Sequence, residues 1–394
     1  MKKILLAFAL LFLIALEILR VYFIMPFPGS QRSDSIDLAY FLQNHIGALR
    51  IVGLLFAIPL LAMTLPKTKG WWKVLLLIPV IFYLAIFYLF NFRFLADKMF
   101  YQPSIKTMSN YLANSVDTNS LVLGVSFNGQ QRAYPIQIIG YHHQVRDTVG
   151  GVPVMVTYCT VCRTGRVYSP VVDGRLEEFR LVGMDHFNAM FEDQSTKSWW
   201  RQVTGEAIAG PSKGKFLQEL PSRQMRLGAW LSLYPQSLVM QPDSGYKKQY
   251  AGLQGYDSGT IKSSLEKRDS SSWKFKSWVI GITAAGSARA YDWNTLVRET
   301  VINDTVGGEP VLLALQEDGS SFHAYSRRMG TQVLTFTWNK QLHRLEDNGS
   351  HASWNWSGRC MEGPLKDSAL TPLNAYQEFW HSWSTFHPRT TKYP

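Results

Sequence analysis

The sequence predicts a chain in two parts. The first is an N-terminal all-α transmembrane segment of three helices, and the second is an α+β or mainly β soluble region built from two pseudo-symmetric repeats. Two observations predict this fold class: three long apolar runs follow one another in the first quarter of the chain, and a stretch of the remainder occurs twice. At 394 residues the chain is long enough for two or three domains, each with its own core.

The three apolar runs cover residues 4–25, 46–65 and 71–92. Each supplies about 20 residues, enough to cross a hydrocarbon core of about 30 Å at about 1.5 Å per residue. Three such runs with short polar links favour membrane helices over buried core helices. No small-x-small cleavage site follows the first run, so we expect an anchor over residues 1–97, not a cleaved signal peptide. Glu17 and Arg20 are spaced to pair on one helix face.

The lysines predict the orientation of this anchor. Lys2 and Lys3 precede the first run, and Lys67, Lys69 and Lys73 flank the link before the third. Cytoplasmic loops are enriched in such cations, so we expect the soluble region on the extracytoplasmic side, the periplasmic side of a bacterial inner membrane. Of the net charge of +11, the first 97 residues carry +5 (nine Lys and Arg minus four Asp and Glu), which leaves +6 for the rest. Without a basic run, this excess does not indicate nucleic-acid binding.

The repeat is visible as an ungapped alignment of residues 121–158 with residues 278–315, at a spacing of 157. Thirteen of the 38 pairs are identical, whereas average residue usage would give roughly two or three. We therefore predict a juxtamembrane linker over 98–120, a first repeat over 121–241, a connector over 242–273 and a degenerate second repeat over 274–394. In the first repeat we expect strands at 121–127 and 152–158, with a short helix from Pro135 to His143.

The two copies differ most at a pair of cysteines. The first copy has Cys159-Thr160-Val161-Cys162 where the second has Gln316-Glu317-Asp318-Gly319. Two cysteines at this spacing can close a disulfide or bind a soft metal. A strand is predicted to end at Tyr158 and another to begin near Gly165, so we expect the pair on a strand-to-strand loop. Cys360 aligns with Ala207 and is expected to be a small buried side chain.

Three functions are compatible with this pair. The first is thiol–disulfide exchange, in which Cys159 attacks and Cys162 resolves, or the two act in the reverse order, and Arg163 and His142 tune the thiol pKa values. The second is metal binding by a set of soft and borderline donors that suits Cu(I) or Zn(II): Cys159, Cys162 and His142, with Met184 or His186. The third is a non-catalytic interaction module stapled by a short disulfide. The partners expected are the lipid bilayer and a thiol-redox or metal-handling protein.

The soluble region also resembles the family catalogued as Domain of Unknown Function 3179. The resemblance rests on a set of residues spread over most of the first copy: Tyr134-Pro135, His142, Asp147, Gly150-Gly151-Val152-Pro153-Val154, Thr157-Tyr158-Cys159, Cys162, Asp193, Thr196, Ser198, Trp200, Gln202, Thr204-Gly205, Gly210, Trp230 and Pro235. The family often has Pro-Leu where this chain has Thr160-Val161. The resemblance implies an extracytoplasmic domain with redox-active cysteines and assigns no reaction.

Overall fold

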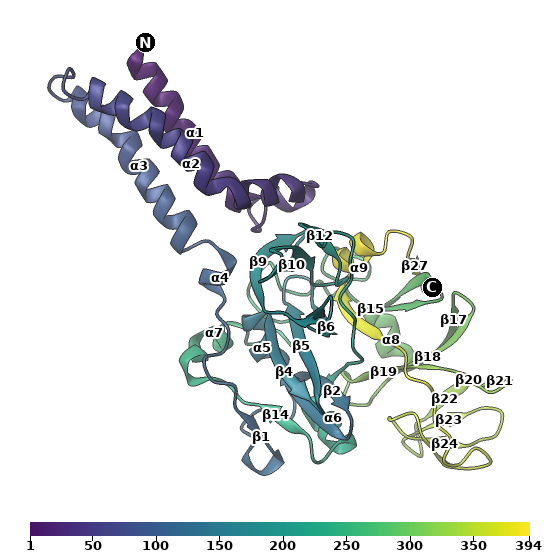
Figure 1. The fold of residues 1–394 in the computed structure, drawn as a ribbon. Helices are drawn as coiled ribbons and strands as arrows, with labels where there is room; N and C mark the ends of the chain where they lie inside the picture. Colours follow the sequence, from purple (N-terminus) through teal and green to yellow (C-terminus); the bar gives the residue numbers. More distant parts are fainter. The chain divides into compact units, whose positions relative to one another are not determined.

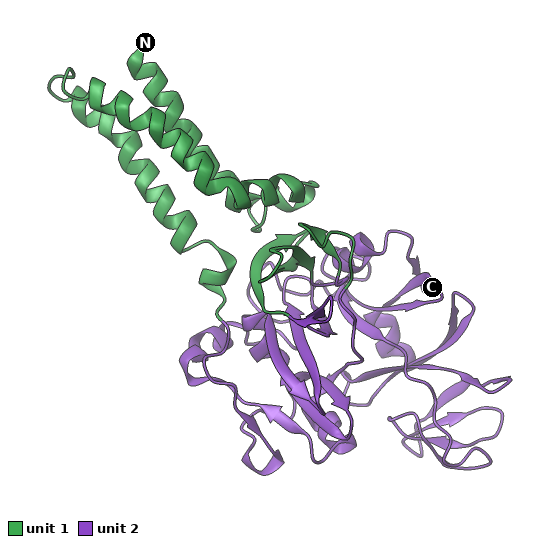
Figure 2. Cartoon of the chain, in the orientation of Figure 1, with its two compact units in different colours: residues 1–101, 177–201, 206–216 green, residues 102–176, 202–205, 217–394 purple.

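A computed structural model describes residues 1–394 (Figure 1). The chain forms two compact units, drawn in different colours in Figure 2. Unit 1 comprises residues 1–101, 177–201 and 206–216. Unit 2 comprises residues 102–176, 202–205 and 217–394.

Unit 1 contains the three predicted membrane helices, α1 (Lys2–Tyr22), α2 (Ile36–Thr64) and α3 (Trp72–Phe92), with the short helix α4 (Ala96–Met99) after them. All three long helices have the length and apolar composition needed to cross a membrane. Helix α2 begins ten residues before the predicted apolar run. Its first turn carries Asp37, and an acidic side chain is favourable at a helix N-terminus.

A polar cluster links the three long helices. Glu17 does not pair with Arg20 as its spacing suggested. Instead its two carboxylate oxygens accept from Arg50 at 2.5 and 2.7 Å. The amide oxygen of Asn91 accepts from Arg50 at 2.6 Å and from Arg20 at 2.7 Å. Each helix therefore contributes a polar group to a network that satisfies charges inside an otherwise apolar bundle.

Unit 1 also contains a four-stranded sheet of order β12-β11-β10-β9, made of β9 (Phe179–Asp185), β10 (Asn188–Asp193), β11 (Trp199–Arg201) and β12 (Ala207–Ala209). The N–H of Met184 donates to the carbonyl of Ile24 at 2.7 Å, which ties β9 to the chain after α1. Asp193 accepts from Thr196 N–H at 2.5 Å and from the indole of Trp200 at 2.7 Å. These family-like residues thus hold the turn between β10 and β11.

The first half of unit 2 contains two main sheets. The five-stranded sheet has the order β1-β14-β3-β2-β13 and the three-stranded sheet the order β4-β5-β6. Their elements are β1 (Met108–Ser109), β2 (Leu121–Phe127), β3 (Gln130–Pro135), α5 (Ile136–His142), β4 (Gln144–Val149), β5 (Val152–Cys159), β6 (Thr164–Tyr168), β13 (Arg223–Arg226), α6 (Leu227–Leu233) and β14 (Leu238–Met240), with the small hairpin β7 (Val171–Val172) and β8 (Arg175–Leu176). The strands predicted at 121–127 and 152–158 and the short helix between them are confirmed.

A connecting segment follows, with the short helix α7 (Lys247–Gly252). The second half has sheets of order β26-β15-β16-β27, β17-β18-β19 and β22-β23-β24-β25. Its elements are β15 (Trp278–Ala284), β16 (Ser287–Asp292), α8 (Trp293–Glu299), β17 (Val301–Val306), β18 (Glu309–Leu315), β19 (Phe322–Ser326), β20 (Arg328–Met329), β21 (Gln332–Val333), β22 (Phe336–Asn339), β23 (Arg344–Asp347), β24 (Ser353–Trp354), β25 (Cys360–Glu362), β26 (Ala375–Phe379), α9 (Trp380–Phe386) and β27 (Thr391–Lys392).

The order of elements from β2 to β6 recurs from β15 to β19. Two glycines at equivalent positions of the aligned stretches show how residues shared by the two copies serve packing. A Cβ on Gly124 would lie 2.4 Å from the ring of Trp230, and a Cβ on Gly281 would lie 2.1 Å from the ring of Trp383. Only glycine lets each strand approach its indole so closely. These parallels support the predicted duplication, which stays a prediction.

Candidate thiol site

The cysteine pair lies on the predicted strand-to-strand turn. Strand β5 ends at Cys159, which is opposite Thr164 at the start of β6. The N–H of Arg163 donates to the carbonyl of Thr160 at 3.3 Å, and Arg163 has a left-handed φ of 57°. Cys159 and Cys162 are not joined in a disulfide, and each is 0% exposed. The turn is therefore closed by backbone hydrogen bonds while both thiols are reduced and buried.

The surroundings of Cys162 act on its thiol in opposite directions. Burial raises its pKa most strongly, and a hydrogen bond with the Cys159 thiol raises it further. The charge of Lys276 and a hydrogen bond with the Ser382 hydroxyl lower the pKa, and the net result is a pKa well above the ordinary value. Cys162 is consequently a thiol, not a thiolate, at neutral pH.

Lys276 is held beside the turn by two contacts. Its Nζ donates to the carbonyl of Val161 at 2.6 Å and lies 3.2 Å from Nε2 of His381. Burial lowers the pKa of Lys276 and the charges of the two cysteines raise it, and the net pKa is lowered. Burial and the charge of Lys276 lower the pKa of His381 to about 3. Nε2 of His381 also lies 3.2 Å from the carbonyl of Val161, so the ring and the lysine meet at the same carbonyl oxygen. Because burial lowers its pKa, the amine is easier to deprotonate than an exposed lysine.

Strand β26 and helix α9 form one wall of the site. The N–H of Phe379 donates to the carbonyl of Cys162 at 3.0 Å. The Ser382 hydroxyl donates to Glu378 at 2.9 Å, and the other carboxylate oxygen of Glu378 accepts from Arg166 at 2.5 Å. The guanidinium of Arg166 also stacks on the ring of Tyr376, 3.4 Å from its centroid. A buried ion pair thus positions the strand that contacts the thiol turn.

The connecting segment covers the turn from another direction. The hydroxyl of Tyr256 donates to the carbonyl of Thr160 at 3.0 Å and lies 3.4 Å from the hydroxyl of Tyr158. The Thr160 hydroxyl contacts Glu266 at 3.4 Å. The segment between the two halves is therefore part of the site's enclosure, and a reagent can reach the sulfurs only when this enclosure opens.

Arg163 and His142 have defined partners in the structure. Arg163 donates to Gln377 at 2.8 Å and to the carbonyl of Tyr256 at 3.1 Å, and its guanidinium stacks on Trp278 at 3.8 Å. Nε2 of His142 lies 2.7 Å from the hydroxyl of Tyr250. Their proposed influence on the thiols stays a prediction, whereas the cation that acts directly on Cys162 is Lys276.

Met184 and His186 belong to unit 1, whereas Cys159, Cys162 and His142 belong to unit 2. Met184 is buried, and Nδ1 of His186 contacts Asp185 at 2.6 Å. No group of three or more His, Cys, Asp or Glu side chains in the chain is arranged to hold a metal ion. The Cu(I) or Zn(II) hypothesis thus has no geometric support.

No pattern in the sequence pointed to four residues around the turn: Lys276, Glu378, His381 and Ser382. All of them belong to the half that lacks the cysteines. A search for residues unique to the cysteine-bearing copy therefore passes over them.

A known protein family covers the residues around the cysteine turn. A family model described as "Protein of unknown function (DUF3179)" matches residues 100–390. The chain belongs to this family. The DUF3179 region includes both halves of unit 2, so the cysteine turn, Lys276 and the wall formed by β26 and α9 all fall inside it. No curated protein and no solved structure matches the chain.

Proposed function

We propose that this DUF3179 membrane protein carries out thiol–disulfide exchange at Cys159 and Cys162. The observation that carries the proposal is the placement of two buried cysteines, three residues apart, on one turn between β5 and β6. Backbone hydrogen bonds close this turn without a disulfide, so the turn does not depend on a bridge for its shape.

The reaction is an exchange with the disulfide of a partner protein. The thiolate of Cys159 attacks one partner sulfur, a mixed disulfide forms, and the other partner sulfur leaves as a thiol after protonation. Cys162 then loses its proton, attacks the Cys159 sulfur and releases the second partner thiol. The cysteine pair is oxidised by two electrons and the partner disulfide is reduced by two.

Lys276 has the position needed for the second step. Cys162 must lose a proton although burial raises its pKa, and the positive charge of Lys276 lowers that pKa. The resulting thiolate and the ammonium group stabilise each other in a low-dielectric site. We therefore assign Lys276 the role of stabilising the thiolate of the resolving cysteine.

The buried position of both sulfurs favours a second candidate, a purely structural disulfide. A bridge between residues three apart closes a loop of four residues, and the chain-entropy relation gives it only about 2 kcal/mol. The turn has its hydrogen bonds without the bridge. A staple would consequently add little stability, and exchange is the better account of the pair.

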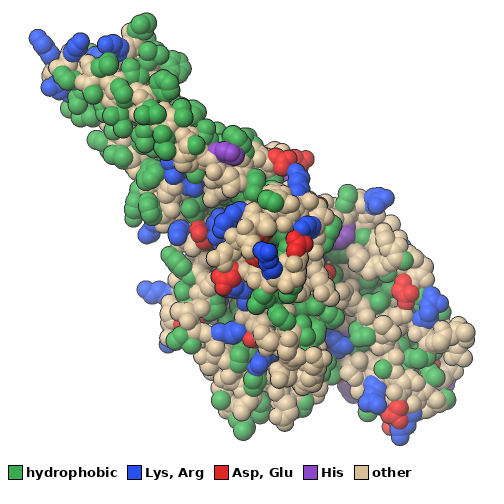
Figure 3. All heavy atoms as spheres, in the orientation of Figure 1, with side chains coloured by type: hydrophobic (Ala, Val, Ile, Leu, Met, Phe, Trp, Pro, Cys, Tyr) green, Lys and Arg blue, Asp and Glu red, His purple; other side chains and the backbone are tan.

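We also propose that the exchange takes place outside the cytoplasm, where disulfides persist. Figure 3 shows Lys and Arg side chains gathered at the end of the helices where α1 begins and where α2 turns into α3. Lys2 lies at this end, with its Nζ 3.7 Å from the sulfur of Met63 near the end of α2. Positive charge marks the cytoplasmic end of such a bundle, so α3 would deliver unit 2 to the opposite side.

Trapping of the mixed disulfide tests the function. In a Cys162→Ser variant, Cys159 can attack a partner but nothing resolves the product. We expect a covalent complex in cells that disappears on reduction and is absent in the Cys159→Ser/Cys162→Ser double variant. Cys360→Ser is the matched control and should behave as the parent protein. Absence of a reducible complex in the Cys162→Ser variant, with normal protein levels, would overturn the proposal.

A further inference from the structure

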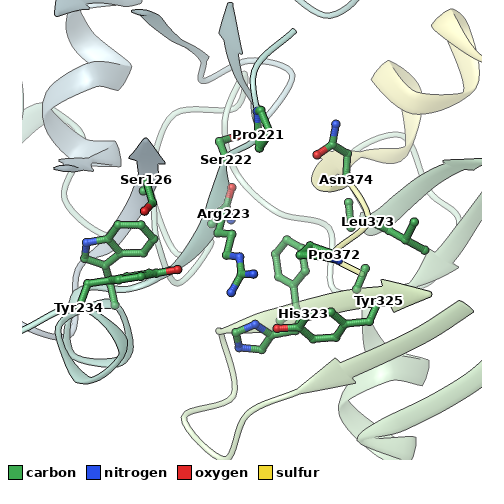
Figure 4. Close-up of a pocket in the computed structure, with 16 residues that line it drawn as sticks. Ser126, Pro221, Ser222, Arg223, Tyr234, His323, Tyr325, Pro372, Leu373 and Asn374 are labelled. Atoms are coloured by element: carbon green, nitrogen blue, oxygen red, sulfur yellow. The ribbon is translucent and has the colours of Figure 1, made fainter. Parts of the chain in front are cut away.

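Unit 2 contains a cavity of about 270 Å³ away from the cysteine turn, between strands β2 and β13 of the first half and β19 and the chain before β26 of the second (Figure 4). Aromatic rings form much of its wall: Trp230, Tyr234, Phe322 and Tyr325. In Figure 4 the guanidinium of Arg223 and the hydroxyl of Tyr234 point into the same space.

Arg223 is the only charged side chain among the residues that line this cavity. It makes no ion pair with a carboxylate, and its Nη1 is buried without a hydrogen-bond partner. Burial and the charge of Arg223 lower the pKa of His323 to about 3, so this neighbour is neutral. A buried guanidinium nitrogen without an acceptor is unfavourable, and an anion in the cavity would supply one.

In the other half of unit 2, strand β26 corresponds to β13 and supplies a carboxylate that neutralises a buried arginine. In β13, Arg223 pairs with Gly124, and in β26, Tyr376 pairs with Gly281, which lies 157 residues after Gly124. By the same registers, Glu378 corresponds to Met225. Glu378 supplies the carboxylate that binds Arg166 at 2.5 Å. At the corresponding position β13 has Met225, and no carboxylate lines the cavity beside Arg223.

We propose that the cavity binds a small monoanionic carboxylate with a short apolar body. The carboxylate would accept from Arg223, and the apolar body would lie against the rings of Trp230 and Phe322. Gln316 Nε2 lies 2.7 Å from Nε2 of His323 and can donate to it. That arrangement leaves the proton on Nδ1 and makes the imidazole a further donor.

Charge and size select this ligand class over inorganic phosphate. One guanidinium balances a single negative charge, and a dianion would leave one charge unbalanced in a partly enclosed space. The rings of Trp230 and Phe322 offer nothing to phosphate oxygens but suit a carbon skeleton. Small organic acids such as propionate, butyrate and benzoate are therefore the appropriate probes.

Binding can be measured by calorimetry and thermal unfolding on the full chain in detergent, with sodium acetate, propionate, butyrate and benzoate at constant ionic strength. We expect saturable binding that strengthens from acetate to a larger member of the series. Arg223→Gln should weaken it at least ten-fold, because a charge-assisted hydrogen bond is lost. Arg328→Gln, which alters a half-exposed arginine outside the cavity, should leave it unchanged.

A second variant distinguishes loss of the ligand contact from misfolding of the Arg223→Gln variant. Ser126 is exposed on β2 at the cavity mouth, so Ser126→Tyr can block entry without disturbing a core residue, and it should also weaken binding at least ten-fold. Saturable binding that both variants retain would overturn the proposal, as would the absence of saturable binding by all four acids. Phosphate binding as tight as that of the best carboxylate would overturn the ligand class.

Discussion

Replacing Glu378 by leucine should destabilise unit 2 strongly. Glu378 is 0% exposed and accepts from Arg166 at 2.5 Å and from Ser382 at 2.9 Å. Burial acts most strongly to lower the pKa of Arg166, but Glu378, Tyr376, Glu219 and Tyr168 together outweigh it, so the net pKa is raised. The arginine is therefore charged, and without Glu378 it is a buried cation whose nearest anion is the partly exposed Glu219 at 3.6 Å.

The magnitude follows from that geometry. Removal of one partner from a buried ion pair costs about 3–5 kcal/mol, and the remaining Glu219 places this case near the lower end, at about 3 kcal/mol. For a domain of about 150–250 residues, this corresponds to a melting temperature lower by roughly 6–12 °C. Glu219→Gln removes the charge from the longer and more exposed contact, keeps an oxygen that can accept from the Tyr376 hydroxyl, and should cost less than about 1 kcal/mol.

Thermal and denaturant unfolding followed by tryptophan fluorescence measures these changes. The double variant Arg166→Met/Glu378→Leu removes both charges and should recover most of the stability, because the cost comes from the isolated cation. A Glu378→Leu variant within about 1 kcal/mol of the parent protein would refute the reasoning. So would a double variant that is less stable than the Glu378→Leu single variant.

Three further predictions concern other charged groups. Lys276→Met should raise the pKa of Cys162 further and slow alkylation of Cys162 at fixed pH. Lys274→Met changes an exposed lysine and is the control. Equal alkylation rates in the two variants would exclude the assigned role of Lys276. Burial lowers the pKa of His143 to about 4, so its neutral form favours the folded state above pH 6.5. Stability is lost as the pH falls from 6.5 towards 4, by about 1.4 kcal/mol at pH 5.5, and a pH titration of the unfolding free energy should show a smaller loss in His143→Gln. Glu17→Leu leaves Arg50 without a carboxylate and should lower the stability of the detergent-solubilised helices by about 3 kcal/mol, whereas Glu17→Leu/Arg50→Leu should recover part of it.

Local patterns predicted the elements of the fold well. The apolar runs identified α1, α2 and α3 because a membrane helix needs about 20 apolar residues in succession. The predicted strand over 121–127 is β2, and the cysteines lie where β5 ends and the turn leads into β6, as expected. Cys360 is buried as its alignment with Ala207 suggested.

Long-range contacts were not predictable in the same way. Glu17 has a possible partner three residues away, yet it pairs with Arg50 on another helix, because the helix faces are chosen by packing. Lys276 and His381 lie more than 100 residues from the turn they contact, and neither belongs to a recognisable motif. The segment over 242–273 has little periodicity, but its Tyr250 and Tyr256 are buried against the cysteine-bearing half.

The reduction potential of the Cys159–Cys162 pair tests the proposed function most directly. The full chain would be equilibrated in glutathione buffers of defined potential, and the thiols that remain would be counted by alkylation and mass spectrometry. Exchange predicts a potential above about −300 mV, so that the pair interconverts with partner thiols. A potential below about −300 mV, or a pair that never forms the disulfide, would contradict it.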